Sequence, residues 1–292
     1  MRLVLPLPGS ETFSAQLAAA GGFELGVLEF RRFPDGERYL RIDADPKGRP
    51  VDIVCPNADE HFLTLAFVAD ALRDLGASEV SLVAPYLGYM RQDARFRPGE
   101  AVTSRTFARL VSCTVDRLIT VDPHLHRFAR LDELYEIPCV ALRAAPLIGE
   151  WIAREVAKPL IIGPDAESEQ WAAEIATKCG APYAVLSKTR RGDRDVQIAM
   201  PDLGLHQGRQ PVLIDDIASS GRTLIAASAA LRKQGFPAPI CVVVHAVFGG
   251  DSFAKASAEA ARIVSTDTVA HASNTISVTS LVADALAGLH QS

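Results

Sequence analysis

The chain has 292 residues, a length that suits two domains of ordinary size better than one small domain. Apolar residues make up 48% and charged residues 22%, which is the balance of a globular protein and excludes a disordered one. The net charge of −5 and the aromatic content of 7% argue against a general nucleic-acid-binding face. No apolar run approaches the roughly 18 residues of a membrane span. The N-terminus, MRLVLPLPGS, is short for a signal peptide and is predicted to be a first buried strand.

Short apolar runs alternate with amphipathic segments along the chain. The predicted strands are 51–56, 79–86, 117–123, 159–165, 181–188, 211–217 and 240–248. The predicted helices are 59–75, 103–113, 168–179, 221–235 and 278–289. Val, Ile and Leu fill the strand runs almost continuously, as in strands that are buried on both faces. This alternation indicates an α/β protein with mostly parallel sheets flanked by helices.

Polar clusters come after several of these strand runs, in both halves of the chain. Three of the runs have acidic residues at or near their carboxyl ends, at Asp122, Asp165 and Asp215–Asp216. In open parallel sheets, ligands bind at the carboxyl ends of the strands, so these positions are candidates for a site. The recurrence predicts two similar α/β domains, 1–145 and 146–277. The Ala-rich C-terminal helix, 278–292, is expected to pack back on the first domain.

The five cysteines are odd in number, are widely spaced and include no CxxC pair. This pattern favours neither a disulfide framework nor a zinc site. Cys55, Cys139 and Cys241 lie in or beside apolar runs, where cysteine behaves as a small core residue. The pattern is typical of a cytoplasmic protein, and neither nucleic acid nor a membrane is expected as a partner.

The segment Val212–Leu224, VLIDDIASSGRTL, has the properties of a ribose-phosphate site. Two adjacent carboxylates can accept hydrogen bonds from the neighbouring hydroxyls of a ribose. The small turn after them lets backbone N–H groups approach a phosphate, and the next helix directs its positive N-terminal end at that anion. The alternative is an ordinary turn with Ser219 or Ser220 as the helix cap. That alternative leaves unexplained two adjacent acids at the end of a buried strand.

This segment resembles the phosphoribosyl diphosphate loop of type I phosphoribosyltransferases and of ribose-phosphate diphosphokinases. Three further segments resemble the diphosphokinase family alone. They are the F-x-D-G-E loop at 33–37, the P-Y-x-x-Y-x-R-Q-D run at 85–93 and the D-x-H turn at 122–124. The four motifs span most of the chain in the order of that family. The resemblance implies two type I phosphoribosyltransferase-like domains and the transfer of a diphosphoryl group from Mg-ATP to ribose 5-phosphate.

The resemblance also implies a role for each motif. The residues implied to bind ATP, in part from a neighbouring subunit, are Phe33, Asp35, Gly36, Glu37, Arg91, Gln92 and Asp93. Those implied to bind ribose 5-phosphate are Asp215, Asp216, Ser219, Ser220, Gly221, Arg222 and Thr223. His124 and Asp165 are implied to position Mg²⁺. Lys188 and Arg190 are implied to be catalytic residues of a loop that closes over the phosphates. A shared ATP site implies a homodimer or a higher homo-oligomer.

Each motif outside the phosphate loop also has a purely structural interpretation. Asp35-Gly36 is a common turn dipeptide, Arg91 and Asp93 could form a surface ion pair, and His124 could be a structural histidine. Asp165 could begin a turn, and the basic run 188–194 could be a solvated hairpin.

The chain also departs from the family in two loops. In the phosphate loop, Arg222 replaces a small residue and Ser219 stands where an acid is common. After Pro164-Asp165, where most members have a pair of glycines, it has Ala166-Glu167-Ser168-Glu169.

Two rival functions stay open: a phosphoribosyltransferase that consumes phosphoribosyl diphosphate, and a non-catalytic regulatory paralogue.

Overall fold

The computed structural model describes residues 1–55, 58–165, 168–191, 195–199 and 201–289, and it gives only the backbone of residues 58–59, 187–191 and 195–199. The chain divides into two compact units. The first unit comprises Met1–Leu142 and Thr279–Ser292, and the second comprises Arg143–Val278. Within the described residues, no helix has the length and apolar character needed to cross a membrane.

The first unit is built on a six-stranded sheet in which every neighbouring pair is parallel. In spatial order, its strands are β2 (Glu24–Leu25), β1 (Leu3–Pro6), β5 (Pro50–Val54), β6 (Glu79–Ala84), β7 (Arg117–Val121) and β8 (Cys139–Leu142). Helices α2 (Ala58–Asp74) and α3 (Thr103–Ser112) contribute to the core of this unit. That core includes Ile53, Leu82 and Leu118 from the strands and Leu65 and Phe107 from the helices.

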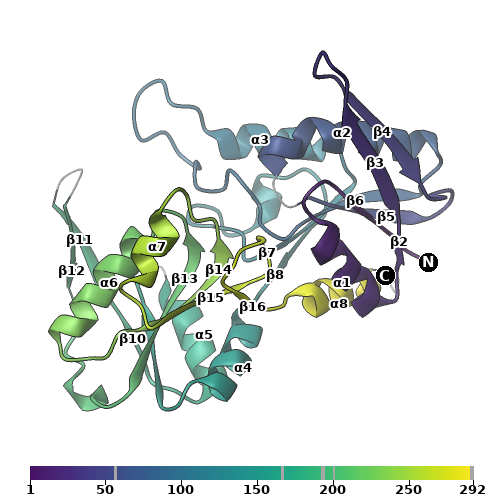
Figure 1. Cartoon of the computed structure of the whole chain (residues 1–292). Coiled ribbons are helices and arrows are strands. Elements are labelled where there is room, and N and C mark those ends of the chain that lie inside the picture. Colours follow the sequence, from purple (N-terminus) through teal and green to yellow (C-terminus); the bar gives the residue numbers. More distant parts are fainter. Residues whose placement is uncertain (56–57, 166–167, 192–194, 200, 290–292) are drawn as a thin grey trace. The chain divides into compact units, whose positions relative to one another are not determined.

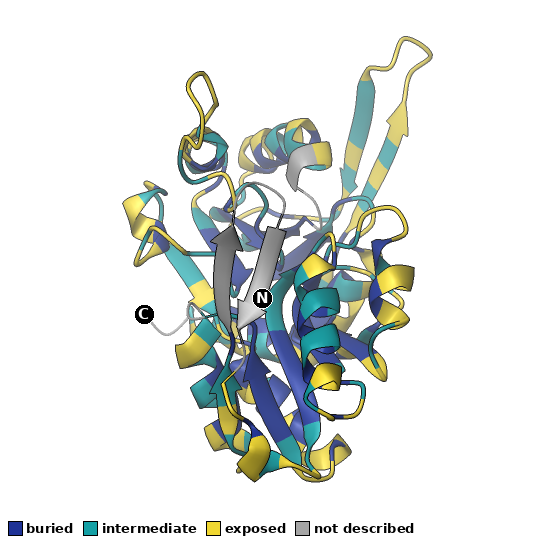
Figure 2. Cartoon of the chain, turned by 90° about the vertical axis from the view of Figure 1, so that its left-hand side faces the viewer, coloured by how far each residue is buried: buried dark blue, intermediate teal, exposed yellow. Residues whose placement is uncertain are grey.

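The second unit repeats this plan with a second six-stranded parallel sheet. In spatial order, its strands are β10 (Tyr183–Val185), β9 (Pro159–Gly163), β13 (Gln210–Ala218), β14 (Ile240–Ala246), β15 (Arg262–Thr266) and β16 (Asn274–Ile276). Its core joins Leu213 and Val243 of the sheet to Leu231 of α6 (Arg222–Lys233) and Ala256 of α7 (Ser252–Ser257). The central strands are buried while the outer faces of the helices are exposed (Figure 2).

Each unit also has an antiparallel hairpin, which follows the edge strand of its sheet. In the first unit the hairpin is β3 (Val27–Arg32) and β4 (Arg38–Asp43), and in the second it is β11 (Ser187–Arg191) and β12 (Asp195–Ala199). Figure 1 shows both hairpins as ribbons separate from the main sheets.

The helix that ends each half of the chain belongs to the other unit. Helix α4 (Ala145–Glu155) follows β8 but packs on α5 (Glu169–Cys179) in the second unit. Helix α8 (Thr279–Gly288) follows β16 but packs on α1 (Glu11–Gly21) in the first unit, next to the N-terminus (Figure 1).

A buried arginine also joins α8 to the sheet of the first unit. Arg2 makes an ion pair with Asp52, with 2.7 Å between Nε and Oδ2, and donates to the carbonyl oxygen of Leu286 at 3.4 Å. The side chains of Arg2 and Asp52 are 2% and 0% exposed. Removing one partner of such a buried pair typically costs about 3–5 kcal/mol, because the other charge is left uncompensated.

The predicted fold class is confirmed, and each predicted helix agrees with an observed one to within two residues at either end. The first strand is also where it was expected, as β1. Helix α1 was missed because only Ser14, Leu17 and Ala18 of its eleven residues are buried, so its sequence shows little periodicity. Strands β3 and β4 were missed because their exposed faces are rich in charge.

Candidate active site

Strand β13 places two carboxylates at the carboxyl end of the second sheet. It runs through Asp215 and Asp216 to Ala218, and Asp215 is in register with Val243 of β14. The Oδ1 atom of Asp215 accepts a hydrogen bond from the backbone N–H of Asp216 at 3.1 Å. The Oδ1 atom of Asp216 accepts one from the N–H of Ile217 at 2.7 Å. These local bonds orient both side chains at the point where the strand leaves the core.

The electrostatics of this strand end favour a ligand with positive charge or with hydroxyl donors. Burial raises the pKa of Asp215 well above its ordinary value, and the charges of Asp216 and Asp165 raise it further. Each of these causes penalises the ionised form of a carboxyl group. A cation or a set of hydroxyl groups would relieve that penalty, and this is the property expected of a binding site.

The turn after β13 leaves the N-terminus of α6 open. Gly221 is the N-cap residue, with φ of +67°, and no side chain forms a capping hydrogen bond there. The serine-cap alternative is therefore wrong for this helix. A Cβ atom at Gly221 would lie 3.3 Å from both the Cβ of Ala256 and the carbonyl oxygen of Ser252. The positive φ and this close contact therefore both favour glycine at the position. The first N–H groups of α6 remain available to an anion.

A neighbouring segment fixes the position of this turn. The carbonyl oxygen of Ser219 accepts hydrogen bonds from Ser252 Oγ at 2.9 Å and from the N–H of Gly249 at 3.3 Å. Ser220 and Arg222 are exposed, and Thr223 is half-buried. Within the described part of the chain, Arg222 makes no ion pair. No sequence motif indicated the contribution of Ser252, because it depends on how α7 packs against the turn.

Asp165 follows β9, the strand beside β13, so it lies at the same edge of the sheet. Its carbonyl oxygen accepts a hydrogen bond from Ser168 Oγ at 2.5 Å, and its N–H donates to the same oxygen at 3.4 Å. A Cβ atom at Gly163 would lie 2.5 Å from Ser168 Oγ, so this contact requires the glycine. Asp165 does begin a turn, and its half-buried side chain also influences Asp215. Ala166 and Glu167 lie outside the described residues.

The run 85–93 follows β6 in the first unit. Leu87 and Met90 are buried in the core, while Arg91 and Gln92 are exposed. Thr103 Oγ1 donates a hydrogen bond to Gln92 Oε1 at 2.6 Å, which ties the run to the start of α3. The side chain of Asp93 is only 8% exposed and pairs with Arg127, with 3.3 Å between Oδ1 and Nε. The suggested ion pair between Arg91 and Asp93 is therefore wrong, and Arg127 is a partner that the sequence did not reveal.

The D-x-H turn follows β7, the neighbour of β6, so the two polar segments of the first unit lie at one edge of its sheet. Asp122 has φ of +36°, which is uncommon for a residue other than glycine. His124 Nδ1 lies 3.0 Å from His126 Nε2, and their ring centroids are 3.6 Å apart. The second histidine was not predicted as part of this turn.

The F-x-D-G-E loop forms the turn of the β3–β4 hairpin, and all of its residues are exposed. The N–H of Phe33 donates to the carbonyl oxygen of Glu37 at 2.8 Å, and the N–H of Gly36 donates to that of Phe33 at 2.9 Å. Asp35 Oδ1 accepts from the N–H of Glu37 at 3.0 Å, and Gly36 has φ of +92°. The turn interpretation of Asp35-Gly36 therefore describes the local structure, and it leaves the loop open to a ligand.

Lys188 and Arg190 lie in β11, opposite Ile198 and Val196 of β12. The hairpin interpretation of this segment describes its backbone. The side chains of both residues lie outside the described part of the structure, so their predicted roles stay predictions.

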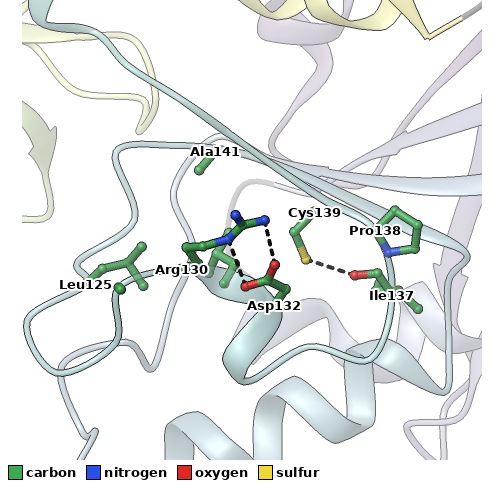
Figure 3. A pocket seen from close by; sticks show the side chains of 9 residues that line it. Leu125, Arg130, Asp132, Ile137, Pro138, Cys139 and Ala141 are labelled. Carbon is green, nitrogen blue, oxygen red and sulfur yellow. Dashed lines mark hydrogen bonds and ion pairs between the residues drawn. The ribbon is translucent and has the colours of Figure 1, made fainter. Parts of the chain in front are cut away.

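A hollow of about 450 Å³ in the first unit is lined by none of the predicted site residues. At its wall, Arg130 and Asp132 pair with each other at 2.7 Å between Nη2 and Oδ2 (Figure 3). Cys139 Sγ donates to the carbonyl oxygen of Ile137 at 3.3 Å. Burial, together with the charge of Asp132, raises the pKa of this thiol to about 11. The thiol is therefore protonated at neutral pH and is a poor nucleophile.

Comparisons with known proteins agree with the motifs. Residues 3–114 match the family model of the N-terminal domain of ribose phosphate pyrophosphokinase, and residues 131–278 match that of the phosphoribosyl transferase domain. A ribose-phosphate pyrophosphokinase of Methanopyrus kandleri is 35% identical over 292 residues, covering 98% of this chain and 99% of the relative. One from Methanosarcina acetivorans is 34% identical over 282 residues, covering 96% and 97%.

A solved structure shows the same fold. The crystal structure of phosphoribosylpyrophosphate synthetase from Mycobacterium smegmatis superposes with a TM-score of 0.85 and 21% identity, covering 99% of each chain. The family models and the relatives confirm the resemblance that the motifs indicated. With a relative that is more than 30% identical along almost the whole length of both chains, the chain belongs to the ribose-phosphate pyrophosphokinase family.

Proposed function

We propose that this chain is a ribose-phosphate diphosphokinase, which transfers the diphosphoryl group of Mg-ATP to the 1-hydroxyl of ribose 5-phosphate. The observation that supports this most directly is the uncapped N-terminus of α6 behind the Asp215–Asp216 pair, in a chain of this family. The loop amides suit a phosphate, and the carboxylates suit the ribose hydroxyls. Both ends of ribose 5-phosphate are thus matched by one turn.

The reaction needs no covalent intermediate. The oxygen of the 1-hydroxyl forms a bond to the β-phosphorus of ATP, the bond from that phosphorus to the α,β-bridging oxygen breaks, and AMP leaves. The proton of the hydroxyl is released. Arg91, Gln92 and the loop 33–37, the last from a neighbouring subunit, hold the nucleotide. Lys188 and Arg190 neutralise the charge that spreads over the transferred group, so catalysis is mainly positioning and electrostatics.

The acidic strand end also fits the magnesium ion that the family resemblance implies. Asp165, Asp215 and Asp216 offer oxygen atoms, the donors that Mg²⁺ prefers. Burial, and then the charges of Asp216 and Asp165, raise the pKa of Asp215, so a bound cation would stabilise its ionised form. We propose that Asp165 and His124 position the ion. When bound, it supplies charge neutralisation to the diphosphate.

We further propose a homodimer or higher homo-oligomer in the cytoplasm. The exposed turn of the β3–β4 hairpin supports the first part, because a projecting ligand-binding loop is suited to completing the site of a neighbour. Light scattering coupled to size-exclusion chromatography tests it. A strictly monomeric enzyme with full activity would contradict the shared ATP site.

One assay distinguishes the candidate functions. The protein is incubated with ATP, Mg²⁺ and ribose 5-phosphate, and AMP and phosphoribosyl diphosphate are measured. AMP that appears only with the sugar phosphate is the expected result. One alternative is a phosphoribosyltransferase, because residues 131–278 match a phosphoribosyl transferase domain, which both functions share. That alternative predicts no AMP, but pyrophosphate release from phosphoribosyl diphosphate and a base. Binding of ATP without turnover would indicate a non-catalytic paralogue.

A further inference from the structure

An arginine and two aromatic rings form a cluster on the β3–β4 hairpin. The Arg31 guanidinium carbon lies 4.1 Å from the ring centroid of Tyr39 and 4.7 Å from that of Phe33. The two rings meet edge to face, with centroids 6.1 Å apart and planes at 85°. Both distances to the cation are within the range of a cation–π interaction, and the ring geometry is a favoured one. The three side chains therefore restrain one another.

Strand pairing explains how these side chains meet. Arg31 of β3 is directly opposite Tyr39 of β4, and Phe33 comes two positions after Arg31, so the three lie on one face of the hairpin. The other face packs on the core of the first unit through Leu28, Leu40 and Ile42. The register that buries these apolar residues thus leaves the Arg31 cluster on the outward face.

The cluster holds Phe33 at the turn. Two backbone hydrogen bonds of Phe33, to Glu37 and from Gly36, fix its main chain. Phe33 nevertheless keeps 38% of its surface exposed at this turn. Arg31 lies over one face of the planar Phe33 ring, so a second planar group would have to stack on the opposite face.

We propose that Arg31 and Tyr39 are positioning residues, which hold the Phe33 ring as a preformed stacking platform for the purine base of ATP. This inference rests on the proposed function, in which the loop 33–37 binds the nucleotide. Aromatic side chains stack on bases, and a ring held in place before binding loses less entropy when the base arrives. Neither Arg31 nor Tyr39 needs to touch the nucleotide.

The test compares Arg31→Ala with Arg41→Ala. Arg41 is on the same face of the hairpin and is 62% exposed, with Glu29 and Asp43 at 3.8 and 3.7 Å, so it controls for charge and for hairpin stability. Arg31→Ala is expected to raise the KM for ATP about five-fold, the equivalent of an exposed cation–π contact. The kcat and the KM for ribose 5-phosphate should change by less than about two-fold. Arg31→Lys, which keeps the cation, should recover part of the effect.

Tyr39 provides a second, independent comparison. Tyr39→Phe keeps the ring and should behave as the parent does, whereas Tyr39→Ala should raise the KM for ATP as Arg31→Ala does. A purine offers more stacking area than a pyrimidine. Arg31→Ala and Tyr39→Ala should therefore also reduce the preference for ATP over CTP. Calorimetric binding of a non-hydrolysable ATP analogue gives the same comparison without turnover.

Two results would overturn the platform. One is a KM for ATP that changes no more in Arg31→Ala than in Arg41→Ala. The other is an equal loss for both substrates, together with a lower melting temperature, which would indicate a structural role alone. In either case the parent protein still forms AMP in the presence of ribose 5-phosphate, so the proposed function stands. A parent protein that forms no AMP refutes the proposed function, and the analogue-binding comparison then decides the platform separately.

Discussion

The two units share one strand order but differ at the carboxyl end of the third strand of each sheet. In the second unit, that strand is β13, which ends in two carboxylates and a turn with an uncapped helix behind it. In the first unit, it is β5, which ends at Val54 and is succeeded by the buried Cys55. The end of the third strand is thus acidic in one unit and apolar in the other, within the same architecture. The fold provides the position, and a few side chains decide whether it becomes a ribose-phosphate site.

The two hairpins extend the comparison. Each is inserted between an edge strand and the third strand of its sheet, yet β3–β4 displays the loop that we propose to bind the nucleotide and β11–β12 contains the basic pair Lys188 and Arg190. If the units differ in function as proposed, substitutions in the two hairpins should have different signatures. Those in β11 should affect turnover, whereas those in β3–β4 should affect the affinity for nucleotide.

The largest effect is expected for Lys188→Ala. Removing a cation that stabilises the transferring group should lower kcat by about 10²–10³-fold, with a smaller change in the KM for ribose 5-phosphate. Steady-state AMP formation measures both. Thr189→Ala, at the adjacent position of the same strand, is the control and should retain activity. A Lys188→Ala enzyme with turnover within a few-fold of the parent would show that the two hairpins do not differ in this way.

Asp215→Asn tests the carboxylates that the first unit lacks. The loss of a charged hydrogen-bond acceptor for the ribose should reduce kcat/KM for ribose 5-phosphate by about 10–100-fold. Asp202→Asn is a suitable control, because Asp202 is an exposed acid whose Oδ1 accepts a bond from the N–H of Gly204. Unchanged kinetics in Asp215→Asn would place the sugar elsewhere.

The same variant should be more stable than the parent at neutral pH. Because the pKa of Asp215 is raised in the folded state, the folded protein binds this proton more tightly than the unfolded chain does. Stability is therefore lost as the pH rises above the unfolded-state pKa toward the folded one, and it stays lower above both. Asparagine does not ionise, so thermal unfolding from pH 4 to pH 8 should show a gain of roughly 0.5–2 kcal/mol that is largest at the alkaline end.

Gly221→Ala should have an intermediate effect on both stability and substrate affinity. The left-handed backbone and the 3.3 Å contacts of a new Cβ should cost about 1–3 kcal/mol and displace the loop amides. Gly235→Ala is a matched control, because Gly235 has φ of +82° with no atom within 4 Å of a new Cβ. The difference between the two denaturation free energies isolates the close contact. Equal losses, with the KM for ribose 5-phosphate unchanged, would refute the tight-turn argument.

The smallest effect is expected for Arg222→Ala, and its sign is informative. A cation in the first turn of a helix opposes the macrodipole, so its removal should stabilise the ligand-free protein by about 0.3–1 kcal/mol. The stabilisation that ribose 5-phosphate confers should become smaller, because a phosphate contact is lost. Lys233 lies at the other end of α6, so Lys233→Ala should destabilise the ligand-free protein. It should leave the stabilisation by ribose 5-phosphate unchanged. Differential scanning calorimetry with and without the sugar phosphate measures both.

Most of the fold could be predicted because buried parallel strands and their helices have strong apolar patterns. The positions of Asp165 and Asp215 were inferred from the rule that ligands bind at the carboxyl ends of strands, and their mutual influence agrees with it. Partners from elsewhere in the chain could not be predicted. Arg127 reaches Asp93, and Ser252 reaches Ser219, only because intervening segments fold back, and neither pair has a local signature. The cluster of Arg31, Phe33 and Tyr39 could not be predicted either, because it depends on the register of the β3–β4 hairpin. The charged residues of these two strands gave no strand signal in the sequence.

The position of α8 has a consequence for folding during synthesis on the ribosome. The second unit, Arg143–Val278, is continuous and can complete its core as soon as it is synthesised. The first unit is synthesised earlier, but α1 lacks its partner, and Arg2 its contact with Leu286, until α8 has been synthesised. The usual order, in which N-terminal domains finish folding first, is therefore reversed. A ribosome that stalls before Thr279 would leave a nascent chain in which the second unit is complete and the first unit still lacks α8.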